Sequence, residues 1–189
     1  MDDQLNDEAL IKEVLQGGKE AFAFLVNRYK DRVYGLLRGM GAQQQDAQDL
    51  TQEAFIKAYR SLSSHHIERS FASWLYTIAA NLLRDSWRRR QADISYGHNL
   101  NAHEHMECPE AMYLQMEKRL EIHDMLLGLS PQHRMVLLLR YTNDLSYEEI
   151  GVILDIPVSK VQNDLHRAKK KMKQLLKDKE VHVHEMLER

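Results

Sequence analysis

The chain has 189 residues, of which 43% are hydrophobic, 8 are glycine and 3 are proline. This composition excludes a disordered chain and favours helices over a turn-rich β architecture. Lys and Arg together number 26 against 28 Asp and Glu, so the net charge of -2 excludes a uniformly basic nucleic-acid-binding protein and directs attention to local charge.

The single cysteine, Cys108, excludes an intramolecular disulfide and fits a reducing compartment. The acidic and polar residues 1–4 are not typical of a secretory signal peptide. No apolar run approaches the ~20 residues that a transmembrane helix needs. A soluble, cytosolic protein is therefore the default expectation.

Helical periodicity dominates the first part of the chain. Asn6 is expected to cap a short helix that ends at Gly17 and Gly18. A longer helix follows and stops at Gly41, a residue that commonly ends helices. The residues on its inward face are Phe22, Leu25, Val26, Tyr29, Val33, Leu36, Leu37 and Met40.

A third helix is predicted over 46–62, and its solvent face is largely acidic. Such a face is most often only solvated, and the alternative is a docking surface complementary to a basic partner. A polar loop is predicted for 61–69. The inward residues of the helix are Ala47, Leu50, Ala54, Ala58 and Leu62, and its solvent-facing residues are Asp46, Asp49, Gln52, Glu53, Lys57 and Arg60.

A fourth helix, capped by Ser70, is predicted to run unbroken from Phe71 to Arg90. Its inward residues are Phe71, Leu75, Ile78, Ala79 and Leu82, and its other side is expected to offer Trp74, Tyr76, Thr77, Asn81, Arg84, Asp85, Trp87 and Arg88. Aromatic rings beside arginines form a surface on which unpaired bases can stack while phosphates are neutralised. The alternative is that the tryptophans are core residues and the arginines a solvated helix end.

Residues 91–109 have no usable periodicity and are predicted to form a flexible linker. His103, His105 and Cys108 in this segment are metal-capable, but their spacing is not a standard zinc pattern and a fourth ligand is missing, so neither a metal nor a cofactor is predicted. Helices resume beyond the linker, where Ser130 and Pro131 begin one of them. The apolar stripe that precedes it consists of Ile122, Met125, Leu126 and Leu129.

The last third of the chain carries a pattern of two short helices followed by positive charge. Ser146 and Glu149 form a capping box at the start of the first helix, and Pro157 ends it because the residue before a proline disfavours helical geometry. Ser159 is expected to cap the second helix, whose inward residues are Val161, Leu165, Ala168, Met172 and Leu175. This arrangement is typical of a helix-turn-helix that enters a DNA major groove.

Together these segments resemble the extracytoplasmic-function (ECF, group IV) sigma factors of the sigma-70 family, subunits of bacterial RNA polymerase. Residues 46–59 resemble the core-polymerase-binding helix, 71–82 the promoter-melting segment and 83–90 the segment that meets the −10 element. Residues 129–136 and the helix-turn-helix resemble the domain that reads the −35 element. The resemblance implies an all-α fold of two small helical domains: a region 2 domain at 1–92, a linker at 93–110, a region 4 domain at 111–177 and a polar tail at 178–189.

The resemblance also implies which residues bind which partner. The acidic helix would bind the basic clamp of the largest polymerase subunit, and the 61–69 loop with the next helix would hold a flipped base of single-stranded promoter DNA. The recognition helix would read duplex DNA. The residues implied are Asp46, Asp49, Gln52, Glu53 and Phe55 for core polymerase; Trp74, Tyr76, Asn81, Arg84, Arg88, Arg89 and Arg90 for the −10 element; and Ser159, Lys160, Gln162, Asn163, His166, Arg167 and Lys170 for the −35 element.

One stretch departs from the family pattern. Gln162 and Asp164 stand where the family commonly has Lys and Arg. The loss of two cations and the gain of a carboxylate are expected to weaken phosphate attraction, with Lys160 and the lysines at 169–171 compensating. A changed −35 preference, or weaker dependence on that element, is the expected consequence.

The implied function is that of a dissociable promoter-specificity subunit for a specific, stress-responsive regulon, without a catalytic site of its own. It would work in the cytoplasm and associate with the nucleoid when active. The implied regulator is an anti-sigma factor, which in this family is often membrane-bound. The alternatives are a stand-alone helix-turn-helix regulator and a metal-dependent hydrolase that uses the His/Cys cluster. A simple repressor needs neither the tryptophan-rich helix nor the acidic one, and the chain has no Gly-rich phosphate loop.

Overall fold

The structure is a computed structural model that describes residues 6–65, 70–95 and 121–187. All regular elements in these ranges are helices, so the all-α prediction is confirmed. Of the helices described, none combines the length and apolarity that crossing a membrane requires. His103, His105 and Cys108 lie outside the described residues, and inside those ranges no cluster of three or more His, Cys, Asp or Glu could hold a metal ion.

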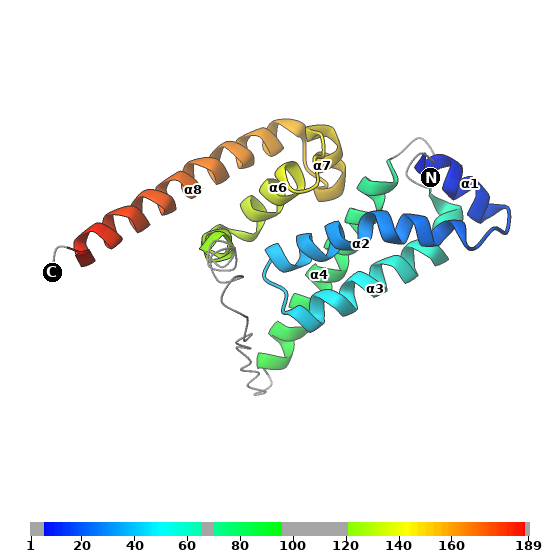
Figure 1. Cartoon of the computed structure of the whole chain (residues 1–189), viewed down its shortest axis with the longest axis horizontal. Helices are drawn as coiled ribbons and strands as arrows, with labels where there is room; N and C mark the ends of the chain where they lie inside the picture. The colour runs from blue at the N-terminus through cyan, green and yellow to red at the C-terminus, as the bar shows by residue number, and fades with distance from the viewer. Residues whose placement is uncertain (1–5, 66–69, 96–120, 188–189) are drawn as a thin grey trace.

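The first domain contains α1 (Asp7–Leu15), α2 (Ala21–Gly39), α3 (Gln44–Arg60) and α4 (Phe71–Ser95), with a short 3-10 helix, η1 (Leu62–Ser64), after α3. The side chain of Asn6 accepts a hydrogen bond from the backbone of Glu8, as the predicted N-cap requires. Gly17 and Gly41 end the first two helices in the left-handed conformation that glycine favours. α2, α3 and α4 then lie side by side and bury the predicted apolar faces between them (Figure 1).

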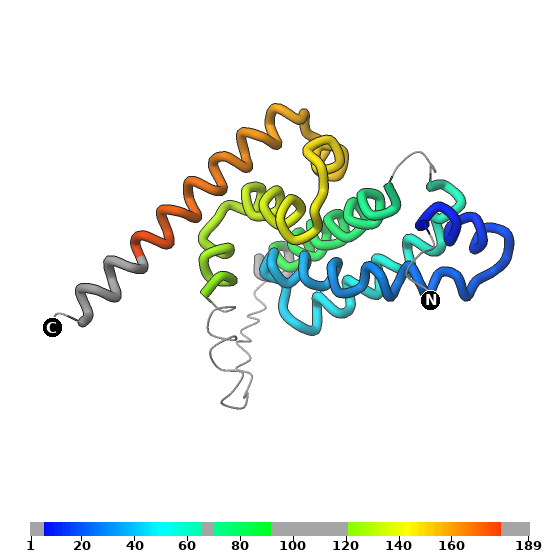
Figure 2. Tube along the Cα trace, turned by 45° about the horizontal axis from the view of Figure 1, so that its top comes forward, coloured from blue at the N-terminus to red at the C-terminus, as the bar shows by residue number. Residues whose placement is uncertain are grey.

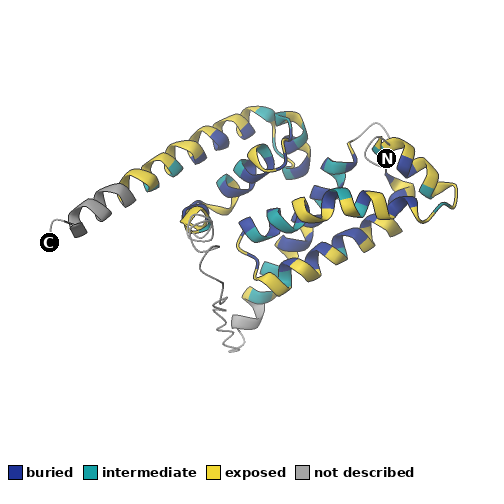
Figure 3. Cartoon of the chain, viewed as in Figure 1, coloured by how far each residue is buried: buried dark blue, intermediate teal, exposed yellow. Residues whose placement is uncertain are grey.

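The second domain contains a helical segment at 121–127, α6 (Pro131–Tyr141), α7 (Tyr147–Leu154) and α8 (Val158–Leu187). The capping box of Ser146 and Glu149 is present, and Asp155 ends α7 in the left-handed conformation. α8 projects away from the rest of the molecule (Figure 1), and the exposed residues predominate along its described outer half (Figure 3).

The prediction that Ser159 caps the recognition helix is wrong by two residues. The carbonyl oxygen of Pro157 accepts hydrogen bonds from the backbone N–H groups of Lys160 and Val161, at 2.9 and 3.2 Å. Pro157 therefore occupies the capping position and Ser159 lies inside the first turn, where its side chain is exposed. A proline suits this position because it has no backbone N–H, and a donor there would have no partner within the helix.

The two domains pack against each other. α7 contacts α4, α6 contacts α2, and the buried apolar residues of both domains form one continuous cluster. Figure 2 shows the yellow-green and yellow segments of α6 and α7 between the orange α8 and the blue-to-green first domain. Ile122, predicted as part of an inward stripe, is 52% exposed, because the neighbouring helices cover only Met125, Leu126 and Leu129 of that set.

Candidate nucleic-acid and partner interfaces

The exposed face of α3 carries acidic and amide side chains. Asp49, Gln52 and Glu53 are spaced three and four residues apart, so they share one side of the helix, and none of them is buried. Glu53 is paired with Lys57 at 3.2 Å. Asp46, at the start of the same face, forms an ion pair with Arg90 of α4. Two of the three carboxylates on this face are therefore paired with cations, and Asp49 lies between them.

Phe55 does not belong to that exposed face. Its ring is 6% exposed and meets the ring of Phe22 edge-on, with centroids 6.4 Å apart. It faces α2 because it lies at the edge of the covered side of α3, where Thr51 and Ala58, one turn away on either side, are also buried. The prediction that Phe55 contacts polymerase directly is not supported by this placement, although its ring borders a shallow apolar groove of about 310 Å³ that Ile56 and Tyr59 also line.

The second half of α4 presents a basic stripe. Asn81, Arg84 and Arg88 recur at helical spacing and are exposed, as is Arg89. Arg88 also lies 3.7 Å from Asp85, one turn earlier. Arg90 differs from the others because α3 runs alongside α4 and brings Asp46 to it, so two side chains predicted to bind different partners bind each other.

The first half of α4 contains an aromatic cluster that His65, at the end of η1, joins. The centroid of the Trp74 ring lies 4.8 Å from that of His65 and 5.9 Å from that of Phe71. These rings cover part of Trp74, and its side chain stays partly exposed. His65, at the end of η1, is buried. The sequence predicted that this histidine lies in a polar loop. The sequence signal for its inward packing is that the aromatic residues Phe71 and Trp74 follow it within ten residues.

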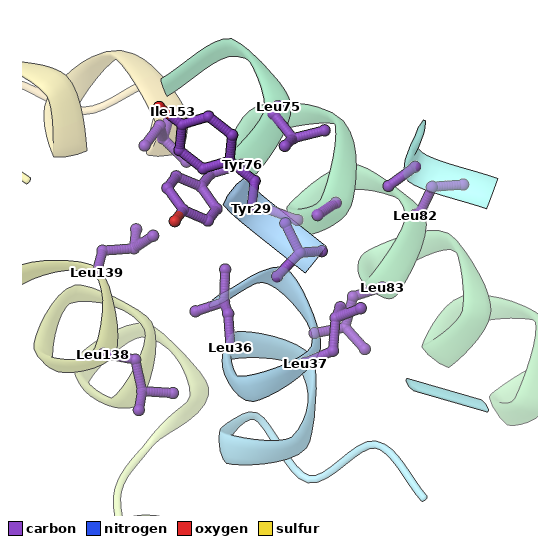
Figure 4. Close-up of a cluster of buried hydrophobic side chains, with 14 of the residues drawn as sticks. Tyr29, Leu36, Leu37, Leu75, Tyr76, Leu82, Leu83, Leu138, Leu139 and Ile153 are labelled. Carbon is purple, nitrogen blue, oxygen red and sulfur yellow. The ribbon is translucent and has the colours of Figure 1, made fainter. Parts of the chain in front are cut away.

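The sequence predicted that Tyr76 lies on an exposed side of α4. This prediction is wrong, because the side chain is fully buried. Figure 4 shows it among Leu36 of α2, Leu139 of α6 and Ile153 of α7. Burial raises the pKa of Tyr76 to about 12, against the opposing effect of nearby Arg32. Residues of both domains therefore cover Tyr76, so DNA cannot reach it in this arrangement.

One face of α8 is exposed and carries the residues that are predicted to read DNA. All seven predicted residues are exposed: Ser159, Lys160, Gln162, Asn163, His166, Arg167 and Lys170. The opposite face buries Val161, Leu165 and Ala168 against the rest of the second domain. The recognition helix thus presents amides and cations on one continuous surface.

Asp164 does not lie on that surface, which corrects the expectation that it repels phosphate. It is 6% exposed and accepts a hydrogen bond from Nε2 of Gln132 at 3.3 Å. Lys160 and His133 lie 3.7 and 3.8 Å from the same carboxylate. Because Gln132 and His133 belong to the first turn of α6, Asp164 fixes the recognition helix against the N-terminus of α6, where a negative charge is favourable.

We expect Asp164→Ala to lower the free energy of unfolding by about 1–2 kcal/mol, because it removes a buried carboxylate that joins the recognition helix to Gln132 and His133 of α6. Gln162→Ala, on the exposed face two residues earlier, should change it by less than about 0.5 kcal/mol and should act instead on affinity for −35 duplex DNA. Urea unfolding and DNA titration of both variants measure the two effects. A loss of stability for Gln162→Ala with none for Asp164→Ala would reverse the assignment.

Arg134 is a buried residue that the sequence did not single out. It is 7% exposed, and its guanidinium donates hydrogen bonds to the carbonyl oxygens of Met40, Leu127 and Leu129 at 2.8, 3.0 and 3.1 Å. Burial lowers its pKa from the ordinary arginine value. The signal in the sequence was a lone arginine just before the apolar run 135–139, although this signal does not identify its partners.

Known proteins show the same organisation. A family model described as Sigma-70 region 2 matches residues 25–92, and one described as Sigma-70, region 4 matches residues 119–172. The chain is 35% identical to the ECF RNA polymerase sigma factor SigW of Bacillus subtilis over 178 residues, 89% of this chain and 95% of that protein. It is 36% identical to the ECF RNA polymerase sigma-E factor of Haemophilus influenzae over 179 residues, 89% and 94% of the two chains.

Solved structures show the same fold. The fold is similar to that of CnrH in complex with the cytosolic domain of CnrY, with a TM-score of 0.72, 24% identity, and coverage of 91% of this chain and 97% of that one. It is also similar to RpoE in complex with the anti-sigma factor NepR from Bartonella quintana, with a TM-score of 0.70, 20% identity, and coverage of 82% and 96%. With both sigma-70 regions present in order and with relatives that match over most of their length, the chain belongs to the ECF sigma factors of bacterial RNA polymerase.

Proposed function

We propose that this chain performs its role as an RNA polymerase sigma factor of the ECF type through three surfaces. The acidic face of α3, centred on Asp49, binds the basic clamp of core polymerase. The aromatic and basic residues of α4 bind the −10 element and help to melt it, and the exposed face of α8 reads the −35 duplex. The observation that supports this assignment is that each surface keeps its polar side chains exposed on a helix whose other side is buried.

The two DNA-binding surfaces differ in their side chains, and each would bind a different form of DNA. Trp74 offers part of a ring for stacking in the first half of α4, and Arg84 and Arg88 lie exposed in its second half, a combination that suits single-stranded DNA. On α8, Gln162 and Asn163 are suited to adenine edges, and Arg167 is suited to guanine or phosphate. The first surface therefore fits unpaired bases and the second fits a major groove.

We propose the following setting for these surfaces. The region 2 domain comprises 1–92, the linker 93–110, the region 4 domain 111–177 and the tail 178–189, although α8 continues as a helix to Leu187. The chain adds promoter specificity to polymerase, has no catalytic site of its own, and acts in the cytoplasm and at the nucleoid on a stress-responsive regulon. An anti-sigma factor regulates it; a structural neighbour, RpoE of Bartonella quintana, was solved in complex with one.

The function is tested with purified core RNA polymerase. We expect the full chain to co-purify with core enzyme and to direct run-off transcription from promoters that the core enzyme alone does not use. Sequencing the transcripts made by the reconstituted holoenzyme from genomic DNA would define the promoter sequence. A chain that binds duplex operators alone and never directs initiation would instead be a helix-turn-helix regulator.

A charge reversal tests the docking surface. Asp49→Arg places a cation against the basic clamp, and we expect it to weaken association with core polymerase by about tenfold or more, since like charges across an interface cost several kcal/mol. Glu13→Arg makes the same change in net charge on an exposed position of α1 and serves as the control. Affinity for core polymerase is measured by fluorescence anisotropy of the labelled chain. Equal weakening by both variants would show a general charge effect rather than docking through α3.

A further inference from the structure

The exposed face of α8 holds its cations in two different ways. Arg167 and Lys170 are exposed, and among the described residues neither has a carboxylate within ion-pairing distance. Lys160, in the first turn, instead has its Nζ 3.7 Å from Oδ2 of Asp164, one turn further along the helix. Its side chain is 52% exposed, so the ammonium group stays open to DNA. Of these three cations, Lys160 is the one whose direction is restrained before DNA arrives.

The carboxylate that restrains Lys160 is itself fixed. Oδ2 of Asp164 accepts a hydrogen bond from Nε2 of Gln132 at 3.3 Å, and Nε2 of His133 lies 3.8 Å from Oδ1. Both partners belong to the first turn of α6, which packs against α8. An ion pair between two exposed side chains contributes little, because both mobile chains must be ordered together. Here only Lys160 has to be ordered, since the folded domain already holds Asp164 in place.

This pairing leaves the ammonium group of Lys160 able to donate hydrogen bonds. A separation of 3.7 Å is an ion-pair distance and is longer than a hydrogen bond, so the three N–H donors remain available. A mobile lysine loses rotamer freedom when it binds, and a side chain that is ordered in advance loses less. A donor of this kind favours a contact that requires one direction, which a base edge does.

The position of Lys160 along the helix fits the same contact. In helix-turn-helix proteins the N-terminal residues of the recognition helix meet the base edges, and Lys160 is the third residue of α8. Lysine most often contacts O6 and N7 of guanine there. Lys170 lies almost three turns further along and has no fixed carboxylate beside it, so it suits phosphates, which carry no sequence information.

We infer that Asp164 is a positioning residue for −35 specificity: it directs Lys160 toward the edge of a guanine and withholds it from general attraction to phosphates. This role rests on the proposed function of α8 as the reader of the −35 duplex. It differs from the role that the sequence predicts for Lys160, which is to compensate for lost phosphate attraction. The negative charge of Asp164 lowers attraction to all DNA, while the lysine that it holds raises attraction to one sequence.

The first test records base preference position by position. Core polymerase is reconstituted with the full chain, and promoter fragments found by transcript sequencing compete for it, each with one base of the −35 element replaced. We expect Lys160→Met to lower the preference for guanine at one position by roughly fivefold or more. Asp164→Asn keeps an oxygen acceptor for Gln132 but removes the charge, and should lower the preference at the same position by about two- to fivefold. In a Lys160→Met chain, Asp164→Asn should have no further effect there, because it acts through Lys160.

Lys170→Met is the matched control for the loss of a cation from the same face. We expect it to weaken binding about equally for all −35 sequences and to reduce the slope of log affinity against log salt by about one. Asp164→Asn should instead raise affinity for fragments with a scrambled −35 element, because it releases a cation. A purely structural role of Asp164 would lower affinity for every sequence alike. Equal effects at all −35 positions for Lys160→Met or for Asp164→Asn would overturn the inference.

A second measurement needs no substitution and decides the question if Asp164→Asn does not fold. Nuclear magnetic resonance relaxation of the lysine Cε groups in the free full chain reports their mobility, and we expect Lys160 to be more restricted than Lys170. Equal mobility of the two side chains contradicts the positioning role, even where run-off transcription by the unsubstituted chain upholds the proposed function. If that chain directs no transcription, the proposed function fails, and the role of Asp164 in reading the −35 duplex fails with it.

Discussion

Replacing Arg134 by alanine is expected to lower the free energy of unfolding by about 3 kcal/mol or more. The side chain donates to the carbonyl oxygens of Met40, Leu127 and Leu129. These carbonyls end α2 and the helical segment 121–127, where backbone acceptors lack partners within a helix and a positive charge is favourable. Alanine leaves all three without this donor, and each unsatisfied buried carbonyl costs about 1–3 kcal/mol.

The measurement is urea unfolding followed by circular dichroism, with Arg89→Ala as the control. Arg89 is exposed on α4, so its replacement should change the free energy of unfolding by less than about 0.5 kcal/mol. Arg134→Lys keeps the charge but not the planar fork of donors, and should recover only part of the loss. A free energy for Arg134→Ala within about 1 kcal/mol of the unsubstituted chain would contradict the role assigned to these hydrogen bonds.

The same substitution, glycine to alanine, is expected to have opposite effects at two helical positions. Gly151 in α7 faces the turn of the helix-turn-helix, where a Cβ would lie 2.9 Å from the backbone carbonyl oxygen of Ile156. That oxygen can move only if the turn opens, and such overpacking costs about 1–3 kcal/mol. A Cβ at Gly35 in α2 meets nothing within 4 Å, so alanine there should gain about 1 kcal/mol from helix propensity alone.

The two variants should therefore differ in unfolding free energy by roughly 2–4 kcal/mol. Because the turn sets the angle between α7 and α8, Gly151→Ala should also weaken binding of −35 duplex DNA, while Gly35→Ala should leave it unchanged. Chemical denaturation and DNA titration of both variants provide the comparison. Equal stabilisation by the two substitutions would show that the turn tolerates a side chain at Gly151.

The sequence alone determined the elements whose signals are local. The capping box at Ser146 and Glu149, the glycine stops at Gly17 and Gly41, and the break before Pro157 all depend on residues within one helical turn of each other. The helix ends that these residues form lie close to the predicted positions. The exposed faces of α3, of the second half of α4 and of α8 were predictable for the same reason, since periodicity separates the two sides of a helix.

The tertiary structure decided which of the remaining faces became covered. Phe55 is buried by Phe22 of another helix, and Tyr76 is buried by a domain that begins beyond the linker. Asp164 is drawn inward by Gln132, 32 residues earlier. Periodicity indicates which residues share one face of a helix. Whether that face is buried depends on the segment that packs against it, and this segment can lie anywhere in the chain. The roles of these three residues therefore required the positions of distant helices, which local patterns do not contain.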